Sequence, residues 1–315
     1  MPQLPEGFDP TKLIAVVGGT GTGKSELGLK IAEHLGALGQ PAAIINCDSM
    51  QFYRGMNIGT AKLSVEERRG VRHELLDWLE VTDDSAAAGY QAVARPMIEQ
   101  LQSDGITPIM VGGSMLYIAA VLNTFEFPGN DEAYRAKLEA DLIEHGPFEM
   151  HRRLAAVDPI AASRIIPENG RRTVRALEII HVTGEPFAAA LPDEVESWQP
   201  LTQIGLSGDR EDLRARLETR VHLMWQNGLL DEVRELETKG LRAGKTASRA
   251  IGYAQALAQL DGEMTEADAI ADTVRLTQKY ARRQISWFKR DPRINWLDYA
   301  DPNNFAKALE LLGLG

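Results

Sequence analysis

An eight-residue segment near the start of the chain has the composition of a phosphate-binding loop. Residues 18–25 read GGTGTGKS, which fits the pattern G-x-x-x-x-G-K-[ST]. Glycines let the backbone N–H groups of such a loop turn toward phosphate oxygens, and the N-terminus of the following helix adds partial positive charge. Lys24 can reach the terminal phosphate, and the Ser25 hydroxyl suits a Mg²⁺ ion. The expected phosphate ligands are Gly18, Gly19, Thr20, Gly21, Thr22, Gly23, Lys24 and Ser25.

The loop alone does not identify the molecule that carries the phosphates. Proteins that hydrolyse nucleotides usually end a later core strand with an acidic residue that helps to hold Mg²⁺. Here the apolar run 106–111 is followed by Gly112-Gly113-Ser114, which argues against a motor or a GTPase. Asp48 follows another apolar run, 42–47, and is therefore expected beside the loop. A carboxylate there suits a general base, and a helix-capping or turn aspartate is an equally good interpretation.

The elements that must position these residues follow an alternating pattern. The phosphate loop lies between the apolar run 13–17 and a helical pattern at 25–38, and further apolar runs cover 42–47 and 106–111. Continuous apolar strands separated by helices are typical of a parallel sheet that is covered on both faces. We therefore predict an α/β fold with a P-loop NTPase-like core, a mainly parallel sheet and helices on both of its faces.

The pattern changes after residue 127. From 132 to about 190 the chain is charged and helical, with no convincing strand. A strand is expected again at 204–206, followed by helices at 211–239 and 265–289, a short strand at 294–297 and a terminal helix. The simplest account is a core domain made of residues 1–127 together with 199–315, interrupted by a helical insertion domain at 128–198.

Composition excludes several classes of protein. Cys47 is the single cysteine, so an intrachain disulfide and a cysteine-based zinc site are both impossible. The N-terminal residues do not resemble a secretory signal, and no apolar run approaches the ~20 residues of a membrane helix. We therefore expect a cytoplasmic protein without a membrane partner. The net charge of −11 argues against a nucleic-acid partner unless basic residues gather on one face.

Basic residues do gather in two places. The segment 275–290 contains six basic residues and no acidic one, and on a helix most of them would share a face while Leu276, Tyr280, Trp287 and Phe288 would largely pack inward. Arg171, Arg172 and Arg175 form a second cluster in the predicted insertion. Either cluster alone reads best as a solvated helix face. Two clusters in a protein with a phosphate loop favour contacts with an RNA backbone.

Beyond these general features, seven blocks of the sequence resemble tRNA dimethylallyltransferases, in the order in which that family has them. They span about 13–298 and are GGTGTGKS at 18–25, DSMQ at 48–51, GMNIGTAK at 55–62, GGSMLY at 112–117, RTVRALE at 172–178, IGY at 251–253 and YARRQISWF at 280–288. Three departures accompany them. Gly19 stands where proline is usual and could loosen the loop, Ser114 replaces a common threonine but keeps the hydroxyl, and Asn46-Cys47 replaces small or β-branched residues.

The resemblance implies a reaction and a set of roles. The exocyclic amine of the adenosine just 3′ to the anticodon would attack C1 of dimethylallyl diphosphate, and diphosphate would leave. Asp48 would be the general base, Thr20 would contribute to catalysis, Ser25 would hold Mg²⁺, and Arg216, with Arg220 as the second choice, would bind the diphosphate from the side opposite the loop. The residues expected to contact tRNA are Asp48, Ser49, Met50, Gln51, Ser114, Arg171, Arg172, Arg175, Arg249, Gly252, Tyr253, Arg282, Arg283 and Lys289.

The expected partners are the anticodon stem-loop of tRNA and dimethylallyl diphosphate, acted on by a monomer whose insertion clamps the RNA loop. A base in a single-stranded loop can be flipped out at lower cost than one in a duplex, which suits an anticodon loop. Three alternatives remain at this point: a P-loop kinase for a small metabolite, a prenyltransferase acting on free AMP, and an RNA-binding protein without catalysis.

Overall fold

The computed structural model describes residues 4–5, 7–124, 127–187 and 196–315. The chain divides into two compact units, one made of Met1–Leu122 together with Ser197–Gly315 and the other of Asn123–Glu196. The end of the expected helical stretch near residue 190 lies outside the described residues.

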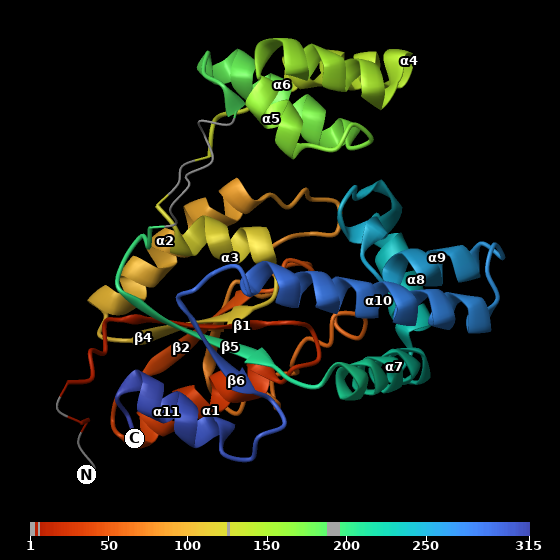
Figure 1. The fold of residues 1–315 in the computed structure, drawn as a ribbon. Helices are drawn as coiled ribbons and strands as arrows, with labels where there is room; N and C mark the ends of the chain where they lie inside the picture. Colours follow the sequence, from red (N-terminus) through yellow and green to blue (C-terminus); the bar gives the residue numbers. More distant parts are fainter. Residues whose placement is uncertain (1–3, 6, 125–126, 188–195) are drawn as a thin grey trace. The chain divides into compact units, whose positions relative to one another are not determined.

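A parallel sheet forms the centre of the first unit (Figure 1). Its order is β3-β2-β4-β1-β5-β6 within the described residues, and every paired neighbour runs parallel. The strands are β1 (Leu13–Gly18), β2 (Ala42–Cys47), β3 (Arg72–Glu74), β4 (Thr107–Gly112), β5 (Leu201–Ser207) and β6 (Ile294–Asp298). The predicted α/β fold is confirmed, and the short edge strand β3 is an addition to it.

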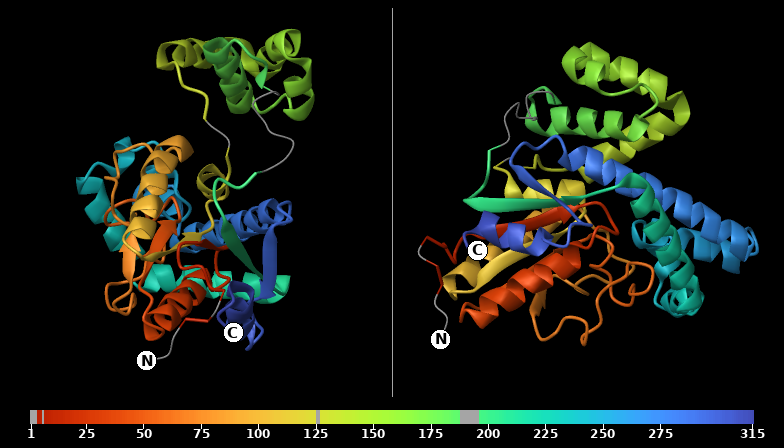
Figure 2. Two further views of the ribbon diagram at one scale, coloured as in Figure 1. Left: turned by 90° about the vertical axis from the view of Figure 1, so that its left-hand side faces the viewer. Right: turned by 60° about the horizontal axis from the view of Figure 1, so that its bottom comes forward.

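Helices cover both faces of this sheet. The helices of the first unit are α1 (Lys24–Ala37), α2 (Ala87–Ser103), α3 (Met115–Leu122), α7 (Arg210–Gln226), α8 (Leu229–Thr238), α9 (Tyr253–Leu260), α10 (Glu266–Phe288) and α11 (Asn304–Leu312). Alternate residues of β1 face opposite ways, so Ala15 packs into a core with α2 and α3 while Val16 packs into a core with α1 and α11. Helices α1 and α11 lie side by side (Figure 2).

The segment expected as one helix at 211–239 is two helices. Helix α7 ends at Gln226 and α8 begins at Leu229, and Gly228 between them has a φ of 94°. Only glycine adopts this left-handed conformation at little cost, so the chain turns here. With α9 and α10, these helices enclose a further apolar core that includes Val233 and Tyr253.

The second unit consists of α4 (Glu132–Val157), α5 (Pro159–Arg164) and α6 (Gly170–Thr183). Helix α4 is kinked at Gly146, which has a φ of 78° and precedes Pro147. The buried carboxylate of Glu178 binds both Arg135, at 2.8 and 2.9 Å, and Arg175, at 2.8 Å. No helix in the described part of the chain is long and apolar enough to cross a membrane.

Candidate active site

The phosphate loop joins β1 to α1 at the carboxyl edge of the sheet. Gly21 in the loop has a φ of 81°, and a Cβ atom built on it would lie 2.7 Å from the side chain of Leu217. Both facts exclude a larger residue without rearrangement. The Gly19 carbonyl accepts hydrogen bonds from the Thr22 hydroxyl at 2.8 Å and from Lys24 Nζ at 2.6 Å. Gly19 is buried, so the loop is held in place even without the proline that is usual there.

Lys24 is half-buried and lines the cavity beside the loop. Burial lowers the pKa of Lys24 to about 8, with Asp48 acting to raise it and Arg220 to lower it further. The Arg220 pKa is lowered by burial as well, and Asp48 again opposes the shift. Two desolvated cations therefore share one carboxylate. This arrangement favours an added anion, because an anion would raise the pKa of both groups back toward their ordinary values.

Asp48 follows β2, and β4 separates that strand from β1. Gly112 at the end of β4 lets the strand ends approach closely, because a Cβ atom there would lie 2.0 Å from the Cys47 carbonyl oxygen. Asp48 Oδ1 accepts a hydrogen bond from the Met50 amide at 3.1 Å, and the Asp48 amide donates to Asn46 Oδ1 at 3.2 Å. The carboxylate is thus oriented by its own turn. Of the two structural alternatives, helix capping does not apply, because no helix begins at this turn, whereas the contact with the Met50 amide is that of a turn aspartate.

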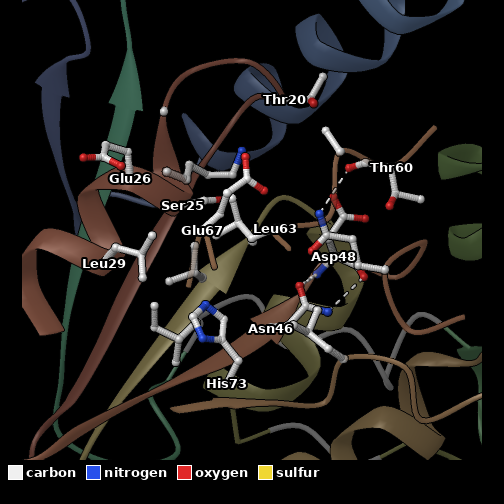
Figure 3. Close-up of a pocket in the computed structure, with 18 of the residues that line it drawn as sticks. Thr20, Ser25, Glu26, Leu29, Asn46, Asp48, Thr60, Leu63, Glu67 and His73 are labelled. Carbon is white, nitrogen blue, oxygen red and sulfur yellow. Dashed lines mark hydrogen bonds between the residues drawn. The ribbon is translucent and has the colours of Figure 1, made fainter. Parts of the chain in front are cut away.

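Two cavities meet at Asp48. The first, of about 560 Å³, contains the loop residues Lys24 and Ser25, together with Gln51 and Arg216 (Figure 3). The second, of about 260 Å³, is lined by residues of α7, α9 and α10 and of the turn that carries Met50. The residues that line both cavities are Thr20, Asp48, Thr60 and Arg220. A molecule on the loop and a molecule in the second cavity would therefore meet beside a carboxylate, a threonine and an arginine.

The two candidate arginines occupy different places. Arg220 donates a hydrogen bond to the Thr60 carbonyl oxygen at 3.2 Å and lies where the cavities join. Arg216 lines the first cavity, is exposed, lies over the Tyr299 ring at 4.9 Å and is 3.9 Å from Asp212. The geometry therefore favours Arg220, the second choice from the sequence, as the arginine at the junction.

The segment 55–62 is fixed by a residue that the sequence analysis did not single out. The carboxylate of Glu232, on α8, accepts hydrogen bonds from the amides of Asn57, Ile58 and Gly59 at 3.0, 2.8 and 3.4 Å. It also accepts one from the Tyr253 hydroxyl at 2.6 Å. The Thr60 carbonyl oxygen at the end of this segment receives Arg220. Glu232 therefore positions one wall of the junction, and only the nearby block 55–62 pointed to this region.

Other residues predicted to contact tRNA in the first unit line one of the two cavities or are buried beside them. Met50, Arg249, Tyr253 and Arg283 line the second cavity, together with Ser49. Ser49 and Ser114 are buried, and the Ser49 amide donates to the Ser114 hydroxyl at 2.8 Å, which ties the ends of β2 and β4. Gly252 is also buried and precedes α9. Gln51 lines the first cavity and donates to the Thr60 carbonyl oxygen at 3.1 Å.

The basic clusters lie on helix surfaces. Arg282 and Arg283 on α10 are exposed, as is Lys289 directly after this helix. Trp287, expected to pack inward, is 42% exposed, so that expectation is wrong; its position on α10 places it beside Ser286 on the solvated side. On α6, Arg171 and Arg172 are exposed, whereas Arg175 is engaged with Glu178 and donates to the Pro128 carbonyl oxygen at 3.1 Å.

The described residues contain no ready-made cluster of metal ligands. No group of three or more histidine, cysteine, aspartate or glutamate residues there could hold a metal ion. The Ser25 hydroxyl lines the first cavity next to Lys24 (Figure 3). Such a site fits Mg²⁺ only as a partner of a bound phosphate group, because Mg²⁺ keeps several waters and takes few protein ligands.

Comparisons with known proteins agree on one family. The family described as IPP transferase matches residues 51–291. A tRNA dimethylallyltransferase of Thermobifida fusca is 55% identical over 95% of this chain and 94% of its own length, and one of Kineococcus radiotolerans is 50% identical over 95% and 96%.

Solved structures give the same result. The tRNA isopentenylpyrophosphate transferase of Bacillus halodurans superposes with a TM-score of 0.69 at 36% identity, covering 96% of this chain and 95% of its own. A eukaryotic dimethylallyltransferase captured acting on tRNA gives a TM-score of 0.80 at 26% identity, covering 95% of this chain and 77% of its own. Since the family model, the relatives and the solved structures agree, this chain belongs to the IPP transferase family of tRNA dimethylallyltransferases.

Proposed function

We propose that this chain transfers the dimethylallyl group of dimethylallyl diphosphate to the exocyclic amine of the adenosine 3′-adjacent to the anticodon of tRNA. The observation that carries the proposal is the junction of the two cavities. One cavity contains a phosphate loop and the other is bounded by the basic helix α10, and Asp48 lines both. This arrangement suits a displacement reaction between a diphosphate ester and a nucleic-acid base better than it suits phosphoryl transfer to a small metabolite.

The donor would bind through its diphosphate. The backbone of the loop, the N-terminus of α1 and the Lys24 ammonium supply positive potential on one side, and Arg220 supplies it from the junction. Arg216, farther out in the same cavity, would add to the field there. Diphosphate departs readily only when its growing negative charge is neutralised, and these groups are in place before the reaction begins. Thr20, which lines both cavities, would lie beside the reacting carbon and leaving oxygen.

The acceptor would be an adenine flipped out of the anticodon loop into the second cavity. Its amine is a weak nucleophile because the ring delocalises the nitrogen lone pair. As the new N–C1 bond forms, the C1–O bond breaks and its electron pair leaves with the diphosphate. Asp48 accepts the proton that the amine loses, which prevents a positive charge from building on the nitrogen.

A magnesium ion bound to the donor would be held through the Ser25 hydroxyl. Such an ion neutralises part of the charge on the leaving diphosphate. Lys24 and Arg220 perform the same task from the protein, so the residues present fit a metal that arrives with the substrate.

The tRNA would contact two regions of the chain. We assign the core domain to residues 1–127 with 199–315 and the insertion to 128–198, and the division into compact units at 122/123 and 196/197 supports this assignment. The exposed Arg282 and Lys289 on the core, and Arg171 and Arg172 on the insertion, suit contacts with the RNA backbone. We expect the enzyme to act as a monomer in the cytoplasm.

Product analysis tests the function directly. Unmodified tRNA is incubated with labelled dimethylallyl diphosphate and Mg²⁺, and the nucleosides are then separated; we expect label on the adenosine next to the anticodon.

The variant Asp48→Asn keeps the shape of the Asp48 side chain, but its amide cannot accept a proton. Turnover should therefore fall by about 10²- to 10⁴-fold while tRNA affinity is retained. A parallel reaction with ATP and small acceptors covers the kinase alternative. Transfer of phosphate without any prenyl transfer would overturn the proposal, and full activity of Asp48→Asn would remove the assigned base.

A further inference from the structure

Helix α10 contacts the phosphate loop through a buried glutamine. Gln284 is 2% exposed and lies 264 residues from Thr20 in the chain. Its Oε1 accepts a hydrogen bond from the Thr20 amide at 2.8 Å, and its Nε2 donates one to the Gly113 carbonyl oxygen at 2.7 Å. One side chain therefore ties the loop that follows β1 to the turn that follows β4.

The surroundings of this side chain leave little freedom. A Cβ atom on Gly113 would lie 2.4 Å from Gln284 Nε2, so the glycine is what admits the amide. In the phosphate loop itself, a Cβ atom on Gly19 would lie 3.1 Å from the Ile285 side chain and 3.3 Å from the Ala281 carbonyl oxygen, and both of these residues belong to α10. Helix α10 thus packs directly against the backbone of the loop as well as bonding to it.

The same helix builds the other cavity. Thr273, Thr277, Tyr280 and Arg283 of α10 line the second cavity, and Arg283 directly precedes Gln284. A single helix therefore forms a wall for the expected adenine and, through the next residue, sets the position of the loop that is expected to hold the diphosphate. Because a helix is rigid, α10 fixes the distance between the phosphate loop and the second cavity. A loop that lost its bond to α10 would also lose its alignment with the acceptor.

We propose that Gln284 is a positioning residue that aligns the donor loop with the acceptor cavity. The inference rests on the proposed function, because it assumes that the loop holds the donor diphosphate and that the second cavity receives the base. Gln284 itself need touch neither substrate. It keeps the Thr20 amide and the Gly113 carbonyl group in place; if its amide were removed, the carbonyl group would be buried without this partner and the partly buried Thr20 amide would lose its acceptor.

The test uses Gln284→Met, which keeps the length of the side chain and removes both hydrogen bonds. The matched control is Gln278→Met on the same helix, since Gln278 bonds to the Arg214 carbonyl oxygen on α7 at 3.3 Å and makes no recorded bond to the loop. For Gln284→Met we expect affinity for dimethylallyl diphosphate alone to fall about tenfold, and kcat with both substrates saturating to fall about ten- to a hundredfold. The dissociation constant for tRNA should stay within about twofold of wild type, and Gln278→Met should match wild type in all three measurements.

Gly113→Ala perturbs the same contact from the opposite side and covers the case in which Gln284→Met does not fold. Its added methyl group would displace the Gln284 amide, so it should show the same loss of donor affinity and kcat with tRNA affinity retained. Equal activity of Gln284→Met and Gln278→Met, or a parallel loss of donor and tRNA binding in both Gln284→Met and Gly113→Ala, would overturn the inference. If wild-type protein transfers no prenyl group to tRNA, the proposed function fails instead.

Discussion

At the scale of single residues, two cations and one carboxylate lie around the phosphate loop and the cavity junction. Lys24 and Arg220 are half-buried, and Asp48 is the carboxylate that acts on both. In a low-dielectric environment each cation gains more from an anionic partner than it would at the surface. Under the proposed function, the site would therefore be prepared for a diphosphate before one arrives, which is how charge stabilisation speeds the departure of a leaving group.

The lowered pKa of Lys24 predicts how donor binding depends on pH. In the protein without a donor, Lys24 has a pKa of about 8, and a bound diphosphate would raise this pKa. Above about pH 8 the complex would therefore hold more protons than the unbound protein. Affinity for dimethylallyl diphosphate should therefore be constant near pH 7 and fall as the pH rises through about 8, by up to about tenfold per pH unit. The ester phosphates themselves complete their ionisation near pH 6, so they do not contribute in this range.

Isothermal titration between about pH 7 and pH 9.5 measures this dependence, with Lys24→Arg as the control. Arginine stays charged throughout, so that variant should bind with little change across the range. A wild-type slope that persists unchanged in Lys24→Arg would assign the titration to another group.

At the level of elements, two loops in the first quarter of the chain are held by helices from its second half. Glu232 on α8 holds the amides of residues 57–59, and Gln284 on α10 holds Thr20. A carboxylate that accepts several backbone N–H groups acts on the whole segment, so the carbonyl oxygen of Thr60 and its partner Arg220 depend on it. The geometry of the donor site is in this sense set from the second half of the chain.

Replacement of Glu232 should loosen this segment. Glu232→Gln turns an amide group toward the N–H donors of residues 57–59, so we expect a loss of about 1.5–3 kcal/mol in the free energy of unfolding. The displaced Arg220 should also raise KM for dimethylallyl diphosphate about tenfold. Urea unfolding and steady-state kinetics measure the two effects.

Glu235→Gln provides a control on the same helix, because Glu235 pairs with Lys239 at the surface, at 2.6 Å. Exposed pairs of this kind contribute little, so its urea midpoint and its donor KM should match wild type. Equal behaviour of the two variants would show that Glu232 does not position the segment.

The whole molecule is acidic, and its proposed partner is a polyanion. The net charge is −11, yet exposed basic residues occur on α10 of the first unit and on α6 of the second. Binding of RNA depends on local clusters, because each cation near a phosphate releases a condensed counterion while distant acidic residues are screened by salt.

Removal of either cluster should weaken tRNA binding and its dependence on salt. We expect Arg282→Gln with Lys289→Gln, and separately Arg171→Gln with Arg172→Gln, to reduce the slope of log affinity against log salt by about 1 to 2 each. Filter binding at several salt concentrations gives the slopes. Arg242→Gln is the control, since Arg242 is already paired with Asp261 at 2.7 Å. If neither double variant changes the slope, the tRNA lies on another surface.

Much of the fold could be predicted because its signals are local. The strands β1, β2 and β4 are continuous apolar runs, and the phosphate loop between β1 and α1 is a contiguous motif. The break at Gly228 is not visible in the sequence, because the helical pattern continues on both sides of it. The exposure of Trp287 is not visible either, because the spacing of residues on α10 does not show which side of the helix packs against a neighbouring element.

The parallel α/β core, the phosphate loop and the family follow from the sequence alone, because each depends on residues that are neighbours in the chain or on blocks that keep their order. The folded chain was needed to see that Arg220 rather than Arg216 lies at the junction, that Glu232 holds residues 57–59, and that Gln284 reaches the loop. Those contacts join positions more than a hundred residues apart, and no local pattern records which side chains the folded chain brings together.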